Sequence, residues 1–150
     1  LGGGLLAALS GGPWKAKVLK VNGIDISLDD IEHGILRPYF KDPRVHYAVN
    51  CASVGCPNLM QEAFTGAGLQ SQLDRGAKAY VNSPRGFLVG SNGVRASSIY
   101  KWFVADFGGE EKGVIAHALK YAEPKLAAEL KGLAAISSYD YDWSLNAAAN

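Results

Sequence analysis

The sequence predicts an α+β fold, in which a small, mostly antiparallel sheet of hairpins packs against several helices. Two turn signals carry this prediction, Asn22-Gly23 and the segment 90–93, because each lies between two short runs that predict strands. Segments with apolar residues at helical spacing follow both turns. Hairpins and helices alternate irregularly, which favours α+β over a doubly wound parallel sheet.

The first elements form a hairpin followed by a helix. Residues 14–21 alternate between apolar and polar and predict a strand, which a type I′ turn connects to a second strand at 24–26. Ser27 is a suitable N-cap for a helix that continues to Leu36. We expect Pro38 to end this helix, because proline removes a backbone donor.

The middle of the chain predicts a strand, a loop, a helix and a hairpin. Residues 45–50 alternate as a half-buried strand does, and a loop of small and polar residues follows them. Apolar residues at helical spacing predict a helix near 66–82. The runs 87–89 and 94–96 flank a glycine-rich turn and predict a hairpin.

Three helices and a strand are predicted in the last third. Ser97 or Ser98 caps a helix that Gly108-Gly109 ends. Two further helices fit residues 110–122 and 124–130, the second with proline in its first turn. Residues 136–143 predict a last strand.

Composition limits the classes of function. The 150 residues predict a single domain, and 48% hydrophobic and 19% charged residues are ordinary for a globular protein. The net charge is +1 and no basic stripe stands out, so we expect no nucleic-acid partner. No apolar run is long enough to span a bilayer. The chain starts without methionine, and we expect residues 1–150 to be the C-terminal part of a longer protein.

The segment 42–57 holds both cysteines of the chain, Cys51 and Cys56, together with His46. A thiol becomes a nucleophile when a histidine, a helix N-terminus or a metal lowers its pKa. The C-x4-C spacing matches neither a zinc knuckle nor a thioredoxin-type motif. A disulfide across this short loop, an inert buried pair, and a zinc or redox site that adds His33 all remain open.

Polar residues nearby are candidates for supporting roles. Glu32 or Asn50 could orient a catalytic imidazole from His46 or His33. Backbone N–H groups around Ser53 could hold an oxyanion. Arg44 and Arg37 could each bind a substrate carboxylate or phosphate. The alternative for both is a structural ion pair with Asp42, Asp29 or Asp30.

Several separated motifs resemble domain-of-unknown-function family 547. They are the segment 27–37, the segment 42–57 with its His and two Cys, Ser98–Phe103 with Asp106-Phe107, and 141–146. The resemblance implies no established activity. It implies a longer family member with an upstream aromatic and asparagine-rich helix, and bacterial members that are often exported, so we expect a periplasmic or secreted location.

Three hypotheses about function follow. The first is a cysteine- and histidine-dependent hydrolase or acyl-transfer enzyme, distantly analogous to papain or transglutaminase, that acts on a small-molecule or peptide substrate. The second is a binding or structural module with a Cys51–Cys56 disulfide or buried pair. The third is a redox or zinc site built from His46, Cys51, Cys56 and His33. We expect no cofactor unless zinc is bound, and the sequence names no protein partner.

Overall fold

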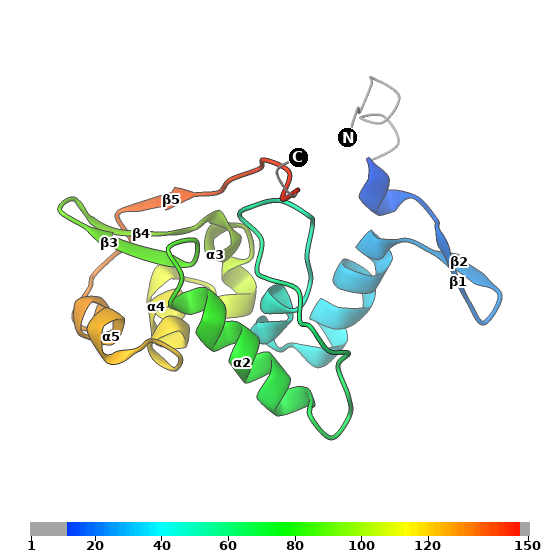
Figure 1. Cartoon of the computed structure of the whole chain (residues 1–150), viewed down its shortest axis with the longest axis horizontal. Coiled ribbons are helices and arrows are strands. Elements are labelled where there is room, and N and C mark those ends of the chain that lie inside the picture. The colour runs from blue at the N-terminus through cyan, green and yellow to red at the C-terminus, as the bar shows by residue number, and fades with distance from the viewer. Residues whose placement is uncertain (1–11, 148–150) are drawn as a thin grey trace. The chain divides into compact units, whose positions relative to one another are not determined.

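The computed structural model describes residues 12–147 and confirms the α+β class (Figure 1). The chain falls into two compact units, Leu1–Asp42 and Pro43–Asn150, and each is described by itself. The single domain that the length suggests stays a prediction. Within the described residues, no helix is long and apolar enough to cross a membrane.

The first unit contains the predicted hairpin and helix. Its elements are the 3-10 helix η1 (Pro13–Lys15), strands β1 (Leu19–Val21) and β2 (Ile24–Ile26), and the π-helix η2 (Asp30–Phe40). Asn22 and Gly23 have φ of 50° and 82°, the two positive values that a type I′ turn requires. The strand is shorter than predicted, because residues 13–15 form a helical turn instead.

The helix of the first unit starts as predicted but ends later. The Asp30 N–H donates to Ser27 Oγ at 3.1 Å and the Ser27 N–H donates to Asp30 Oδ2 at 2.7 Å, a reciprocal cap. The Lys17 ammonium and the Ser27 donors hold the pKa of the Asp30 carboxyl well below its usual range. The prediction that Pro38 ends the helix is wrong. The last turn is closed beyond the proline, where Lys41 takes φ 50° and donates to the Arg37 carbonyl at 3.2 Å.

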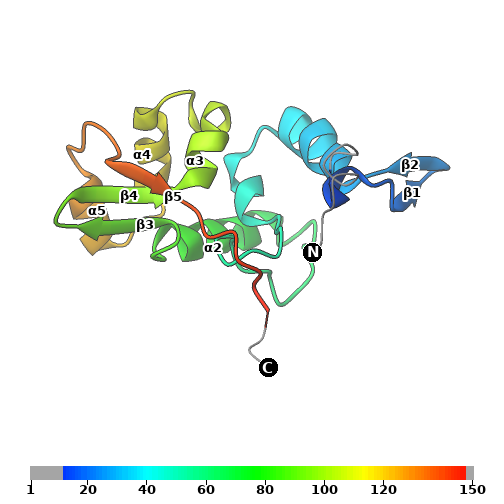
Figure 2. The same cartoon turned by 90° about the horizontal axis from the view of Figure 1, so that it is seen from above.

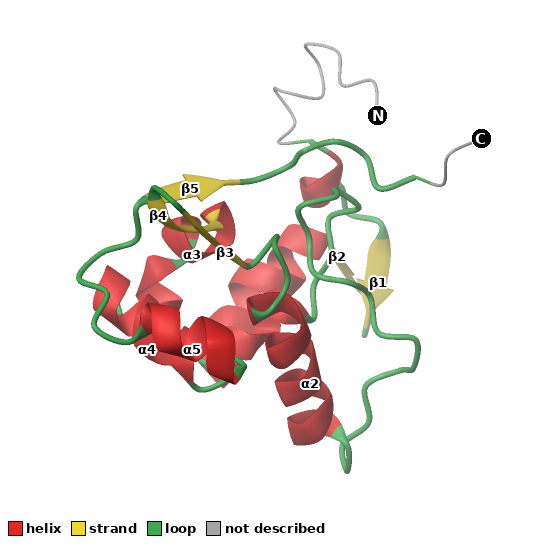
Figure 3. Cartoon of the chain, turned by 60° about the vertical axis from the view of Figure 1, so that its left-hand side comes forward, coloured by secondary structure: helices red, strands yellow, loops and turns green. Residues whose placement is uncertain are grey.

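The second unit contains a three-stranded sheet and most of the helices (Figures 2 and 3). Its elements are η3 (Pro43–Tyr47), α2 (Leu69–Val81), β3 (Phe87–Gly90), β4 (Gly93–Ser97), α3 (Ser98–Trp102), η4 (Val104–Phe107), α4 (Glu111–Leu119), α5 (Pro124–Leu130) and β5 (Ser138–Asp140). The strand order is β3-β4-β5; β3 pairs antiparallel with β4, as predicted, and β5 adds in parallel. Ser97 caps α3, accepting from the Ile99 N–H.

The core of the second unit is rich in tyrosine. Tyr47 and Tyr100 are almost fully buried, and burial raises the pKa of both phenols. The Tyr47 hydroxyl lies 2.9 Å from Nε2 of buried His117 and 3.3 Å from the Tyr100 hydroxyl. A buried hydroxyl without a partner would be costly, so this network is what lets tyrosines replace purely apolar residues here.

The predicted strand at residues 45–50 is wrong. Residues 43–47 form the 3-10 helix η3, and the N–H groups of Ala48 and Val49 both donate to the Val45 carbonyl. Val45, His46 and Tyr47 are all buried, although they are consecutive. A half-buried strand would expose every second side chain, whereas a tight turn seated in the core can bury three in a row. The fixed φ of Pro43 suits the first helical position.

Candidate functional site

The loop that carries both cysteines is held by the C-terminal segment of the chain. The N–H groups of Val54 and Gly55 donate to the carbonyls of Ser144 and Asp142, each at 2.8 Å. Ser53 and Leu145 form an antiparallel bridge next to these bonds. The loop therefore takes its shape from residues about ninety positions away.

Two side chains support the same loop through its carbonyl groups. The Tyr80 hydroxyl, on α2, donates to the Gly55 carbonyl at 2.7 Å. The Arg85 guanidinium donates to the carbonyls of Val54 at 3.2 Å and Cys56 at 2.7 Å. A side chain at Gly55 would have its Cβ 2.9 Å from a Tyr141 ring atom, so only glycine fits here.

The Asn50 side chain hydrogen-bonds to both ends of the loop that carries the two cysteines. Its Nδ2 donates to the Pro57 carbonyl and its Oδ1 accepts from the Ala52 N–H, both at 2.6 Å. Ala52 has φ 63°, a left-handed conformation that residues with a Cβ rarely adopt. The amide and the tight turn together bring Cys51 back against Cys56.

The two cysteines are free thiols in direct contact. Their sulfur atoms lie 2.7 Å apart, and the Cys51 N–H donates to Cys56 Sγ at 3.0 Å. Cys51 is half-buried, whereas Cys56 is buried. One thiol is thus accessible and the other is shielded directly behind it.

Two hydroxyl groups also contact the sulfurs. Ser53 Oγ lies 3.0 Å from Cys51 Sγ, and the Tyr141 hydroxyl lies 3.2 Å from Cys51 Sγ and 3.1 Å from Cys56 Sγ. A thiolate can only accept hydrogen bonds, so these groups donate when Cys51 is ionised. Burial raises the pKa of Cys51, but donors from Cys56, Ser53 and Tyr141 outweigh it, and the pKa falls below its ordinary value.

Tyr141 remains a neutral donor at the site. Burial and the two thiols beside it raise its pKa. Its ring packs against Trp102 and Trp143, with centroids 4.9 Å and 4.7 Å away. These indoles fix the phenol over the sulfurs, although both remain substantially exposed to solvent, 46% for Trp102 and 67% for Trp143.

His46 pairs with an acid that the sequence did not suggest. Its Nε2 donates to Asp106 Oδ2 at 2.7 Å, and its ring stacks on Phe103 with centroids 4.2 Å apart. Asn50, one of the residues predicted to orient it, is bonded to the loop backbone instead. Within residues 12–147, no histidine hydrogen-bonds to either sulfur.

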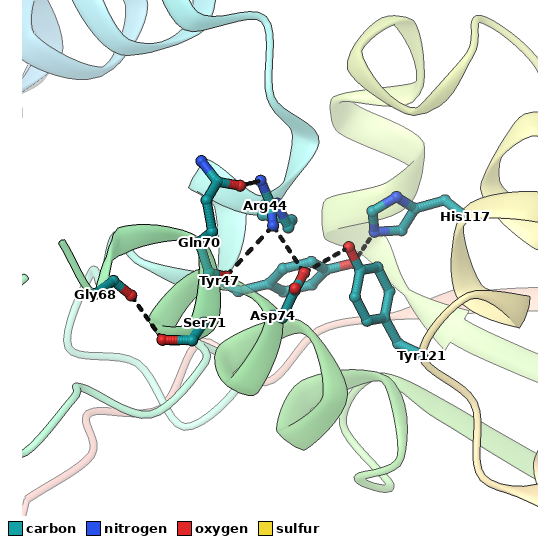
Figure 4. Close-up of polar contacts among 8 residues, drawn as sticks. All are labelled: Arg44, Tyr47, Gly68, Gln70, Ser71, Asp74, His117 and Tyr121. Atoms are coloured by element: carbon teal, nitrogen blue, oxygen red, sulfur yellow. Dashed lines mark hydrogen bonds and ion pairs between the residues drawn. The ribbon is translucent and has the colours of Figure 1, made fainter. Parts of the chain in front are cut away.

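Arg44 forms an ion pair with Asp74 of α2, a partner that the sequence did not suggest (Figure 4). Its Nη1 donates to Asp74 Oδ1 at 2.7 Å, and its guanidinium also reaches Gln70 of α2. The Tyr121 hydroxyl donates to the same Asp74 oxygen at 3.1 Å. Arg44 therefore ties η3 to α2.

The candidates Glu32, His33 and Arg37 lie on η2, in the first unit, whereas the cysteines lie in the second. Arg37 Nη1 donates to His33 Nδ1 at 3.1 Å, and Glu32 lies 3.9 Å from the same nitrogen. The three predicted residues therefore form a local cluster on one helix.

One chemical expectation, the oxyanion site, loses support from this geometry. The N–H groups of Val54 and Gly55, predicted to hold an oxyanion, already donate to carbonyls. Among the described residues, no group of three or more His, Cys, Asp and Glu side chains is arranged to hold a metal ion.

Comparison with known families gives one match. A family model described as "Protein of unknown function, DUF547" matches residues 7–81, half of the chain. The chain belongs to this family. No curated protein and no solved structure matches it significantly.

The DUF547 match ends with the last residue of α2, and several residues that complete the thiol site lie beyond it. Tyr141, Arg85 and Asp106 were not predicted as site residues. Tyr141 and Asp106 occur in motifs that led to the DUF547 resemblance, which was the available signal for them. Arg85 follows a serine-proline turn and carries no signal of its own.

Proposed function

We propose that this chain carries a two-cysteine thiol–disulfide exchange site, with Cys51 as the attacking thiol and Cys56 as the resolving thiol. The observation that supports this most is the pairing of a half-buried thiol of lowered pKa with a buried thiol whose sulfur is 2.7 Å away. Attack needs an accessible thiolate, and resolution needs a second thiol within bonding reach.

The proposed reaction balances with a disulfide as co-reactant. The Cys51 thiolate attacks one sulfur of R–S–S–R′ and forms a Cys51–S–S–R bond, while R′S⁻ leaves and takes up a proton. The Cys56 thiol loses its proton to solvent, and its sulfur attacks Cys51 Sγ. The Cys51–Cys56 disulfide forms and RS⁻ departs, so two electrons pass from the protein to the substrate.

A hydrolase or acyl-transfer enzyme is the second candidate, favoured by the His46–Asp106 pair at 2.7 Å. An imidazole held by a carboxylate is the usual base for a cysteine nucleophile. That role requires His46 to take the proton of Cys51. The hydrogen bonds to the Cys51 sulfur come instead from Ser53, Cys56 and Tyr141, which favours exchange.

The test is exchange with bis(2-hydroxyethyl) disulfide, followed by intact-mass spectrometry. The wild type should release both mercaptoethanol halves and end as an internal disulfide. Cys56→Ser should release one half and keep the other as a mixed disulfide, whereas Cys51→Ser should not react. Equal reaction of the two single variants would overturn the assigned order, and no reaction of the reduced wild type would overturn the function.

The same preparations test the hydrolase. His46→Gln, compared with wild type at equal folded fraction by circular dichroism, should alkylate at Cys51 at an unchanged rate if exchange is correct. A large loss of that rate in a folded variant would transfer support to the histidine-dependent enzyme.

A further inference from the structure

A cavity of about 620 Å³ lies on the side of the cysteine loop that follows Cys56. One wall is the segment 57–62, which continues directly from that residue, and the other is a face of α2. Its lining residues are Pro57, Asn58, Leu59, Met60, Gln61, Glu62, Arg75, Gly76, Ala79, Tyr80 and Arg85. This volume is in the range of small-molecule sites, roughly 300–1,000 Å³.

The charge that lines this cavity is not balanced. Arg75 pairs with Glu62, so these two charges offset each other. Arg85 donates only to neutral oxygens, the carbonyls of Val54 and Cys56 and Asn58 Oδ1. Within residues 12–147, no carboxylate pairs with it. The cavity therefore holds one guanidinium charge without a counter-ion.

Arg85 also has unused donors. A guanidinium has five N–H groups, and the bonds to the loop and to Asn58 use both hydrogens of Nη1 and one of Nη2. The Nε–H and the second Nη2–H have no partner within the described part of the chain. Adjacent donors of this kind bind a carboxylate through both of its oxygens.

We propose that this cavity binds the carboxylate-bearing arm of the disulfide substrate, with Arg85 as the anchor. The inference rests on the proposed exchange function and names its substrate class, a small disulfide with a carboxylate a few bonds from sulfur. Position supports it, since Arg85 Nη1 is 2.7 Å from the Cys56 carbonyl. Arg85 therefore contacts the backbone of a residue that carries one of the two thiols.

Arg85 supports the loop, so its replacement would confound recognition with structure. Ala79 is exposed, lines the cavity from α2, and gives a matched pair of variants. Ala79→Glu and Ala79→Gln have nearly the same volume and good helix propensity, and they differ in one charge. Glutamate adds a negative charge to the cavity wall and should repel an anionic ligand, whereas glutamine should only occupy space.

The first measurement compares exchange rates with 3,3′-dithiodipropionate, which is dianionic, and neutral bis(2-hydroxyethyl) disulfide. The KM for the dianion should be about tenfold higher in Ala79→Glu than in Ala79→Gln, as expected for one like charge near a protein surface. For the neutral disulfide, the ratio of the two KM values should stay near one. Equal ratios for both substrates would overturn the inference and leave the exchange function standing.

The second measurement follows ligand binding in a variant that cannot carry out exchange. In Cys51→Ser, which cannot exchange, dithiodipropionate should still bind saturably when followed by tryptophan fluorescence or NMR. Adding Ala79→Glu should weaken that binding about tenfold relative to adding Ala79→Gln. Saturable, charge-sensitive binding without exchange in the wild type would refute the proposed function alone. Absence of binding in Cys51→Ser would refute the carboxylate site.

Discussion

Replacing Tyr141 with phenylalanine removes one hydroxyl from the thiol site and keeps the ring that packs against Trp102 and Trp143. The hydroxyl lies 3.2 Å from Cys51 Sγ and 2.8 Å from Ser53 Oγ. A hydrogen bond to a charged group contributes about 1.5–3 kcal/mol. Its single proton is shared among three acceptors, so we take the lower end. Because one pKa unit is about 1.4 kcal/mol, the pKa of Cys51 should rise by about one unit.

The assay is the rate of Cys51 alkylation by iodoacetamide as a function of pH, resolved by mass spectrometry. Only the thiolate reacts, so below the midpoint the rate should fall about tenfold in the variant at equal pH. Tyr139→Phe is the matched control, since it removes a phenol that donates to Glu111, 2.9 Å away, and touches neither sulfur. An unchanged midpoint in Tyr141→Phe, or an equal shift in the control, would refute the reasoning.

Three further predictions concern stability and the role of the His–Asp pair. Ala52→Gly relieves a left-handed alanine and should raise the free energy of unfolding by about 0.5–1 kcal/mol, measured by urea denaturation. Asp106→Asn should cost about 1–2 kcal/mol in the same assay, because it weakens the bond to buried His46, while the Cys51 alkylation rate stays unchanged. The pKa of Cys51 is lowered in the folded protein. The reduced wild type should therefore gain stability as pH rises from the folded-state pKa to the ordinary thiol value of about 8.5. It should lose this stability as pH falls through the folded-state pKa. Cys51→Ser should lack this rise in a pH series of unfolding curves.

The parts of the fold that the sequence predicts are those set by neighbouring residues. The Asn22-Gly23 turn, the cap at Ser27 and the cap at Ser97 each depend on chemistry within three or four positions. The strand predicted at residues 45–50 was wrong, because an alternation of only six residues is a weak signal. Burial of His46 against Phe103, which comes from distant residues, decided its conformation.

The sequence also predicted only part of the thiol site, again because contacts with distant residues leave no local pattern. Cys51 and Cys56 stand out by residue type, and the loop between them by composition. Tyr141 and Arg85 reach the loop only through the pairing of residues 52–55 with 142–146 and through the end of α2. No local pattern encodes that register. The sequence therefore located the two thiols but paired them with a histidine, since it could not show which donors surround the sulfur atoms.

The donors around Cys51 also fix the direction in which the proposed exchange is favoured. These donors stabilise the Cys51 thiolate, whereas a disulfide sulfur carries no charge for them to stabilise. They therefore favour the reduced form, which makes the Cys51–Cys56 disulfide a stronger oxidant. At a pH above the pKa of Cys51 in both proteins, removing the Tyr141 hydroxyl should therefore shift the equilibrium with a reference dithiol about tenfold toward the Cys51–Cys56 disulfide. Thiol trapping after equilibration in dithiothreitol buffers of defined ratio measures it. A shift toward the dithiol would show that the hydroxyl acts on the disulfide or on Cys56 rather than on the Cys51 thiolate.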